Sequence, residues 1–150
     1  MKSVRTAAVA LILIALSFAA SPLQSSVIFV PEVESIYDVT YARFADSELQ
    51  LDIAWPREGG PYPVLVYFHG GGWGIGDKIM FRHRMEMIAQ SGYVVFNANY
   101  RLSTDARFPA AVNDAMGAVI FAKDKAPDYN GDPDRVAVMA DSAGAHLAAM

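Results

Sequence analysis

Hydrophobic and polar residues alternate along two neighbouring segments, residues 37–44 and 49–55, which a short polar stretch separates. A period of two is typical of strands that bury one face, so this pattern predicts an antiparallel hairpin. Residues 63–68 form a continuous apolar run instead. Such a run is typical of a strand that is covered on both faces. The sheet is therefore expected to become parallel at this point.

Helical spacing of apolar residues alternates with further apolar runs over the rest of the chain. The pattern predicts helices over 79–90 and 108–120, buried strands over 93–100 and 135–139, a loop over 126–134, and a last helix that begins at Ser142. Pro109 suits the first turn of the second helix. Strands that alternate with helices imply a mostly parallel, three-layer α/β sheet with the hairpin as an antiparallel edge.

The first residues have the features of a secretory signal peptide. Lys2 and Arg5 precede an apolar run, and the small residues Ser17 and Ala19 suit a cleavage site after Ala19. The alternative is a retained membrane anchor, but the apolar run is short for a membrane span. We therefore expect a signal peptide over 1–19, a linker over 20–36, no stable membrane span after cleavage, and a secreted or periplasmic protein.

Composition narrows the class of the remaining chain. The 150 residues include 12 Lys and Arg, 16 Asp and Glu, and no Cys, with 53% hydrophobic content. This composition describes one globular domain and excludes disulfide scaffolds and thiolate metal sites. The net charge is −4 and no basic cluster occurs, so nucleic acid is not an expected partner.

A glycine-rich loop, residues 69–78 with the sequence HGGGWGIGDK, follows the first apolar strand. Glycine lets bare N–H groups point at an anion. A dinucleotide fingerprint needs glycines at relative positions 1, 3 and 6, which no start in this loop provides, and Asp77 separates Gly76 from Lys78 where a phosphate loop needs Gly-Lys. The loop therefore does not indicate a nucleotide cofactor.

Residues 140–144, Ala-Asp-Ser-Ala-Gly, lie between a predicted strand and a predicted helix. This strand, turn and helix context is that of a nucleophile elbow, in which a sharp turn exposes the Ser142 hydroxyl. The N–H of Ala143 is then placed to stabilise an oxyanion, with further donors from Gly71 and Gly72. A serine before a helix is more commonly an N-cap, but the flanking small residues and the upstream loop favour a nucleophile.

The sequence resembles the α/β-hydrolases of the hormone-sensitive-lipase-like branch, close to bacterial carboxylesterases and feruloyl-esterase-like hydrolases. The resemblance rests on three motifs in the order that the family has them, at residues 69–73, at 100–102 followed by 108–114, and at 141–144. It implies that residues 37–150 are the N-terminal part of an α/β-hydrolase domain. It also implies ester hydrolysis through an acyl-enzyme, with no cofactor and no metal. The resemblance assigns Ser142 as the nucleophile and Gly71, Gly72 and Ala143 as the oxyanion hole, while His69 and Asp141 are expected to brace the loops.

Several positions depart from the family pattern. Ala140 replaces a usual Gly, and Thr104-Asp105 replaces a common Pro-Glu. Only eight residues follow Ser142, whereas this fold places the catalytic acid and then the histidine after the serine. His146 lies one helical turn past Ser142 on a helix that points away from it, so it is not expected to be the base. The chain is therefore interpreted as an N-terminal half, truncated after the elbow and inactive by itself.

Other polar residues are predicted to have structural roles. Arg101 and Asp114 are expected to form a structural ion pair, and His83 to lie on a solvated helix face. Residues 128–139 lack the Gly and Glu that a calcium loop requires, so they are read as a turn. The last strand is expected to leave an apolar edge that promotes aggregation.

Three functions remain open at this stage. The first is a carboxylesterase that acts on a small-molecule or polysaccharide-linked ester in an open site. The second is a serine peptidase of the prolyl-oligopeptidase type, which shares the fold and the elbow. The third is a non-catalytic exported domain that binds an acyl or carboxylate ligand with the glycine loop.

Overall fold

A five-stranded sheet between two helical layers makes up the part of the chain that the computed structural model describes, residues 31–44 and 47–150. The predicted signal peptide and most of the predicted linker lie outside these residues. The strands are β1 (Val33–Arg43), β2 (Glu48–Pro56), β3 (Tyr62–Phe68), β4 (Val94–Ala98) and β5 (Gly131–Ala140). The helices are η1 (Lys78–Phe81), α1 (Arg82–Gln90), α2 (Ala110–Lys125), η2 (Ala126–Tyr129) and α3 (Ala143–Ala149), of which η1 and η2 are 3₁₀ turns.

The strands lie in the order β1-β2-β4-β3-β5. β1 pairs with β2 and β2 with β4 in antiparallel fashion, while β3 pairs in parallel with both β4 and β5. The predicted antiparallel hairpin at one edge of the sheet is confirmed, while the rest of the described sheet, expected to be mostly parallel, is parallel over β4, β3 and β5 only. Its first strand begins at Val33, so residues 33–36 belong to the sheet and not to the linker in which they were placed.

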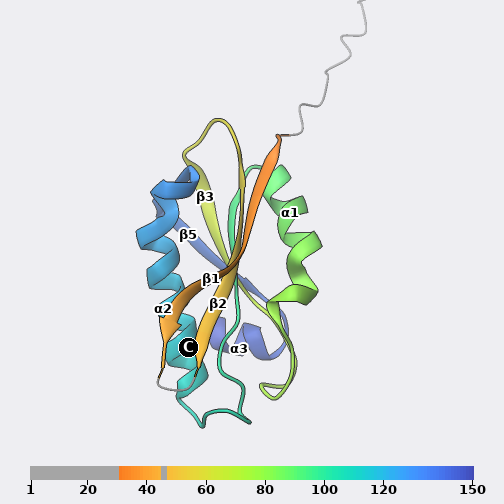
Figure 1. Cartoon of the computed structure of the whole chain (residues 1–150), viewed down its shortest axis with the longest axis vertical. Coiled ribbons are helices and arrows are strands. Elements are labelled where there is room, and N and C mark those ends of the chain that lie inside the picture. The colour runs from red at the N-terminus through yellow and green to blue at the C-terminus, as the bar shows by residue number, and fades with distance from the viewer. Residues whose placement is uncertain (1–30, 45–46) are drawn as a thin grey trace, which may run out of the picture.

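Two hydrophobic cores, one on each face of the sheet, make the protein three-layered. On β3, Val64, Val66 and Phe68 face α2 and α3, while Tyr67 packs with Phe81 on the other face, below α1. This alternation follows from the period of two along a strand. Figure 1 shows the layers, with α1 on one side of the twisted sheet and α2 on the other. The predicted three-layer α/β fold is therefore confirmed.

Three element predictions need correction. The helix expected over 79–90 is a 3₁₀ turn followed by α1. α2 begins at Ala110, so Pro109 is its N-cap residue and not part of its first turn, a position where the missing N–H costs nothing. The loop expected over 126–134 contains η2, and its last residues already belong to β5.

The prediction of a short, buried last strand is also wrong. β5 has ten residues, and Val138 and Met139 are exposed. The reason is its place at the edge of the sheet, where only β3 pairs with it among the strands described. An apolar run alone cannot distinguish a central strand from an edge strand that awaits a partner.

The sheet places the two sequence motifs at the same edge. β3 and β5 are parallel neighbours, so their carboxyl ends meet. The glycine loop follows β3 and the segment around Ser142 follows β5. In open α/β sheets, ligands bind at this edge where the strand order reverses. None of the helices within the described ranges is long and apolar enough to cross a membrane.

Candidate active site

Ser142 occupies an unusual backbone conformation between β5 and α3. Its φ of 47° and ψ of −113° lie outside the regions that residues with a side chain ordinarily adopt. Its side chain is exposed and does not cap the helix that follows. The N-cap alternative therefore lacks the hydrogen bond that would define it. A strained turn that leaves a serine hydroxyl free is the geometry of a nucleophile elbow.

Gly144 explains how the chain makes so sharp a turn. A Cβ at this position would lie 2.7 Å from the carbonyl oxygen of His69, and closer still to that of Phe68. The first turn of α3 therefore packs directly against the end of β3. Asp141 donates its backbone N–H to the Phe68 oxygen (3.3 Å) and accepts from the N–H of Gly144 (2.9 Å). Only glycine allows this approach of helix to strand.

The glycine loop lies against this elbow. A Cβ on Gly70 would be 3.1 Å from the backbone oxygen of Asp141 and 3.3 Å from the Cβ of Ser142. Gly71 has a φ of 131°, and its oxygen accepts from the N–H of Ile75 (3.1 Å), which closes a tight turn. Gly72 has a φ of 58° and is exposed, with open space where a Cβ would lie. The loop thus brings Gly70 into contact with Ser142.

The three predicted oxyanion donors remain available in this arrangement. Within the described ranges, no backbone oxygen accepts a hydrogen bond from the N–H of Gly71, Gly72 or Ala143. Ala143 begins α3, where the first N–H groups have no partner inside the helix. Free N–H groups at a helix start and in a glycine turn form a natural anion site.

His69 is buried and holds the start of the glycine loop. Its Nδ1 lies 2.8 Å from the oxygen of Gly70, and its ring stacks on Tyr100 with a centroid distance of 4.5 Å. The Tyr100 hydroxyl donates to the backbone oxygen of His69 (2.8 Å). Burial raises the pKa of Tyr100, so the hydroxyl stays protonated and able to donate. These contacts fit the expected bracing role.

Asp141 is exposed on the other side of the elbow. It accepts a hydrogen bond from the hydroxyl of Tyr67, whose ring stacks on Phe81 with centroids 3.3 Å apart. Burial, together with this hydrogen bond and the charge of Asp141, raises the pKa of Tyr67 far above its ordinary value. The neutral phenol therefore anchors the residue that precedes Ser142 to strand β3.

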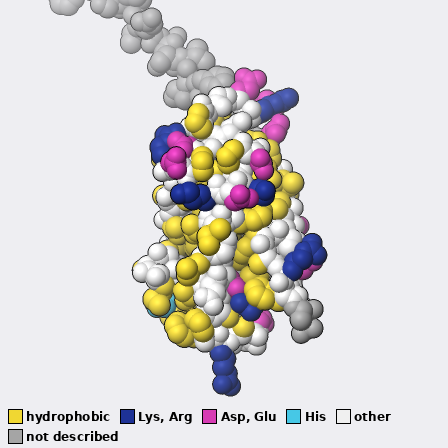
Figure 2. Space-filling view, turned by 90° about the vertical axis from the view of Figure 1, so that its left-hand side faces the viewer, with side chains coloured by type: hydrophobic (Ala, Val, Ile, Leu, Met, Phe, Trp, Pro, Cys, Tyr) yellow, Lys and Arg dark blue, Asp and Glu magenta, His cyan; other side chains and the backbone are white. Residues whose placement is uncertain are grey.

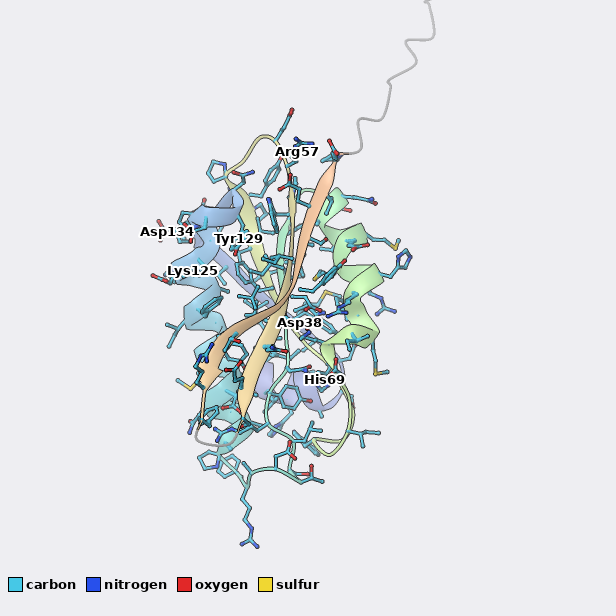
Figure 3. All side chains as sticks on the ribbon, viewed as in Figure 1. Asp38, Arg57, His69, Lys125, Tyr129 and Asp134 are labelled. Carbon is cyan, nitrogen blue, oxygen red and sulfur yellow. The ribbon has the colours of Figure 1, made fainter. Side chains whose placement is uncertain are left out.

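Two cavities flank the glycine loop. One, of about 260 Å³, is mostly apolar and is lined by Gly72, Trp73, Ser103, Ala106, Phe108, Ala111, Val112, His146 and Leu147. The other, of about 390 Å³, lies on the side of Asp141 and is lined by Tyr67, His69, Gly70, Gly71, Ile75, Gly76, Met80, Phe81, Arg84 and Asp141. Figure 3 places His69 at the lower end of the sheet, opposite Arg57 and Asp134.

No histidine in the described segments is hydrogen-bonded to Ser142. His146 lies edge-on to the ring of Trp73, with centroids 5.4 Å apart, and lines the apolar cavity. His69 is engaged with Gly70, and His83 is exposed on α1. The structure thus brings together the elbow and the glycine loop, but it does not add a general base to them.

Arg101 and Asp114 form the structural ion pair that the sequence predicts. Two parallel hydrogen bonds join the guanidinium to the buried carboxylate (2.9 and 2.7 Å), and the backbone N–H of Arg101 donates to the same group (2.9 Å). The hydrogen bond to Asp114 raises the pKa of Arg101 further. The pair connects α2 to the segment after β4, and the guanidinium lies 3.7 Å from the ring centre of Phe44.

A buried charge cluster behind the glycine loop was missed in the sequence. Lys78, which is 2% exposed, binds the fully buried Asp52 (2.8 Å) and also Asp38. Arg82 reaches the same two carboxylates at 2.7 and 3.1 Å. The signal lay in β2, where Asp52 stands between the apolar residues Leu51 and Ile53. Residues 51–54 are all buried. The alternating pattern predicts only that one face of the hairpin is buried, so it does not reveal that the face with Asp52 is covered too.

Asp52 stays charged in spite of its burial. Desolvation alone would raise the pKa of its carboxyl group, but hydrogen bonds from Arg82, Lys78 and the backbone of Asp38 outweigh this and hold the pKa below its ordinary value. The cluster joins β1, β2 and η1, so it fixes the segment that leaves the glycine loop.

The mixed sheet, the strained serine at the carboxyl end of β5 and the glycine turn beside it define an α/β-hydrolase. The family follows from direct comparison. The chain belongs to the BD-FAE family, whose model matches residues 51–150. The resemblance to hormone-sensitive-lipase-like carboxylesterases is confirmed by the relatives that the chain matches.

Those relatives are esterases. The carboxylesterase NlhH of Mycobacterium tuberculosis is 32% identical over 112 residues, which is 69% of this chain and 33% of NlhH. The esterase Est2 of Thermogutta terrifontis superposes with a TM-score of 0.68 at 30% identity, over 80% of this chain and 43% of Est2. An esterase of Pyrobaculum calidifontis gives a TM-score of 0.66 at 35% identity, over 79% and 38%. The chain thus spans about a third of the length of the curated relatives that it matches.

Proposed function

We propose that the protein to which this chain belongs hydrolyses carboxylic esters through an acyl-enzyme formed on Ser142. The observation that carries the proposal is the backbone of Ser142, held at a φ of 47° with its hydroxyl exposed and not used as a helix cap. Such a conformation is costly and persists where the position has a function. The family and its esterase relatives support the same reaction.

In the proposed mechanism, Oγ of Ser142 attacks the ester carbonyl carbon. The carbonyl oxygen becomes negative and accepts hydrogen bonds from the N–H groups of Gly71, Gly72 and Ala143. Collapse of this intermediate releases the alcohol, which takes up the proton lost by the serine, and water then hydrolyses the acyl-enzyme. His69 and Asp141 act on the loops and not on the substrate.

The base and the acid of the triad are expected from the polypeptide that follows the elbow. In this fold the acid and then the histidine come after the serine in chain order. The chain covers only about a third of its curated relatives, which is consistent with this expectation. We propose that the 150-residue chain is inactive without those groups.

The substrate is proposed to be a small-molecule or polysaccharide-linked ester, and no cofactor is required. The apolar cavity of about 260 Å³ beside Gly72 offers room for one hydrophobic group of the ester. We further propose that the protein is exported, to the periplasm or the medium, on the basis of the basic and apolar residues 1–19.

The test is turnover of a short-chain aryl ester by the full-length gene product and its Ser142→Ala variant. Loss of the nucleophile is expected to lower kcat by at least about 10³-fold. Ser91→Ala, at the end of α1 and away from the site, is the matched control and should retain activity. Turnover near wild type in Ser142→Ala would contradict the proposal.

Peptide substrates and binding measurements distinguish the alternatives. Cleavage of peptide amides in preference to esters would favour a peptidase of the prolyl-oligopeptidase type. Binding of a carboxylate without turnover of any ester by the full-length product would favour a non-catalytic domain.

A further inference from the structure

One side chain, Asn99, holds the end of the glycine loop that is remote from β3. Its Oδ1 accepts the backbone N–H of Lys78 (2.6 Å), and its Nδ2 donates to Oδ2 of Asp77 (2.9 Å). The other carboxylate oxygen of Asp77 accepts the N–H of Ile79 (2.8 Å) and so caps η1. The carboxylate of Asp77 therefore accepts one hydrogen bond from Asn99 and one from the backbone of η1.

Asn99 is itself tied to the sheet. Its backbone N–H donates to the oxygen of Gln50 on β2 (3.1 Å), and its oxygen accepts the hydroxyl of Tyr41 on β1 (2.6 Å). The neighbouring Asn97 donates from Nδ2 to the backbone oxygen of Lys78 (2.8 Å). Lys78 at the loop end is thus held at its N–H by Asn99, just after β4, and at its C=O by Asn97 on β4. β4 itself pairs with a strand on either side.

The rest of the loop is held by its own turn, in which the N–H groups of Gly74 and Ile75 donate to the oxygen of Gly71 (3.2 and 3.1 Å), and by the contacts of His69. His69 continues β3, and the oxygen of Trp73 accepts the N–H of Ser103 (2.7 Å). No heavy atom lies within 4 Å of the point where a Cβ on Gly72 would be, so the position of Gly72 depends on where the two loop ends are held. Oxyanion donors act only when they are held within about 0.5 Å of the productive geometry.

We propose that Asn99 and Asp77 are positioning residues of the oxyanion hole, acting through the glycine loop without touching the substrate. This inference rests on the proposed ester hydrolysis. The pair is remote from Ser142 in the chain, and its side chains meet each other and the loop end, not the elbow. Its effect should therefore fall on kcat more than on KM, because transition-state stabilisation is lost while substrate contacts remain.

The first variant is Asn99→Asp in the full-length gene product. It keeps the oxygen that accepts from Lys78 but replaces the donor to Asp77 by a second oxygen, so two carboxylates face each other. We expect kcat to fall at least tenfold while KM changes less than threefold. Should this variant fail to fold, Asp77→Asn removes the same hydrogen bond without adding a charge, and kcat should fall in the same direction.

The decisive variant exchanges the two groups, Asn99→Asp with Asp77→Asn. The new amide at position 77 can donate to the new carboxylate at position 99, and its oxygen can still accept from Ile79. The direction of one hydrogen bond is reversed and every partner is satisfied again. We expect kcat to return to within threefold of wild type.

Asn130→Asp is the matched structural control. Asn130 lies before β5, at the opposite end of the sheet, and its Nδ2 donates to the oxygens of Pro56 and Arg57 (3.2 Å each). We expect both this variant and Asn99→Asp to lower the urea midpoint of unfolding, but the control should leave kcat unchanged. Amide hydrogen exchange of the loop should rise in Asn99→Asp and not in the control.

The outcomes separate this inference from the proposed function. The positioning role is overturned if Asn99→Asp has the kcat of wild type. It is also overturned if the double variant with the two groups exchanged folds but does not recover kcat. Retained turnover in Ser142→Ala, measured in parallel, overturns the proposed function instead. In that case amide hydrogen exchange of the glycine loop still tests whether Asn99 and Asp77 hold it. Equal protection of the loop in wild type and Asn99→Asp overturns that role.

Discussion

At the scale of single residues, two backbone positions make the elbow possible. Ser142 adopts a φ of 47° although it carries a side chain, and Gly144 lets α3 begin against the oxygens of Phe68 and His69. The strain at the serine is tolerated because the strand before it and the helix after it are both packed. The two positions therefore depend on each other.

Two glycine substitutions should separate steric exclusion from backbone strain. Gly144→Ala puts a Cβ 2.7 Å from the His69 oxygen. We expect it to lower the free energy of unfolding by about 3 kcal/mol, since backbone atoms would have to move. Gly72→Ala has open space but a φ of 58°, so the cost should be about 1 kcal/mol.

Urea unfolding of both variants in the full-length gene product checks this pair. Equal midpoints for Gly144→Ala and Gly72→Ala would show that the close approach of α3 to β3 is not required.

Among single residues, those with local signals could be predicted and those with distant partners could not. Ser142, Gly71 and Gly72 stand in short motifs whose chemistry is readable from neighbours in the chain. Asn99 looks like one more polar residue at the end of a strand, because its partners Asp77 and Lys78 are reached only through the fold. The role of Asn99 depends on its distances to Asp77 and Lys78 in the folded protein, which the spacing of residues in the sequence does not give.

At the scale of elements, the Arg101–Asp114 pair connects α2 to the end of β4. Asp114 accepts three hydrogen bonds and is buried, so Asp114→Ala leaves a guanidinium and a backbone N–H without their acceptor. We expect a loss of about 3 kcal/mol in the free energy of unfolding. Asp132→Ala removes an exposed pair with Arg135 and should have a much smaller effect.

Denaturant unfolding of the two variants measures this difference. A smaller loss for Asp114→Ala than for Asp132→Ala would contradict the structural importance of the pair.

The charge cluster that joins β1, β2 and η1 predicts a dependence of stability on pH. The pKa of Asp52 is lowered in the folded protein, so the unfolded chain takes up a proton first as the pH falls. The contribution is complete above the unfolded pKa of about 3.9 and is lost as the pH drops through the lower, folded pKa. Stability of the wild type should therefore decline below about pH 4.

Asp52→Asn should show a shallower decline over the same range, because the residue that titrates is gone. Urea midpoints at several pH values below neutral measure both slopes. Parallel slopes for wild type and variant would assign the acid sensitivity to other carboxylates.

Element types followed from periodicity more reliably than their burial did. The hairpin and the helices repeat every two or every three to four residues, and these repeats are visible locally. β5 was expected to be buried because residues 135–139 are apolar, yet it lies at the edge of the described sheet with Val138 exposed. The hairpin pattern predicts one buried face, yet Asp52 on the other face of β2 is fully buried as well. The burial of a strand depends on which elements pack against it, and the sequence of the strand itself does not show this.

At the scale of the whole molecule, an apolar groove lies between α2 and α3, beside Val138 of β5. A cavity of about 250 Å³ is lined by Phe68, Ala115, Met116, Val119, Ile120, Val138, Leu147, Ala148 and Met150. Met116 and Ile120 are more than half exposed. Figure 2, which views the side of the molecule that carries α2, shows hydrophobic side chains over much of this face. Exposed apolar surface beside an unpaired strand edge favours association.

The chain of residues 20–150, produced alone, should therefore self-associate. Light scattering after size exclusion measures its mass, and Val138→Lys, which puts a charge into the groove, should reduce the association. A monomer that melts cooperatively would contradict this prediction.

The position of β4 has a consequence for how the chain is made. It lies between β2 and β3, although it leaves the ribosome after both of them. Until it emerges, the hairpin and β3 have no strand to join them, and the apolar β3 waits without a partner on either side. The nascent protein should therefore be most dependent on chaperones while residues 62–98 are being synthesised. β4 then joins the hairpin to β3, and the other edge of β3 stays open until β5 follows.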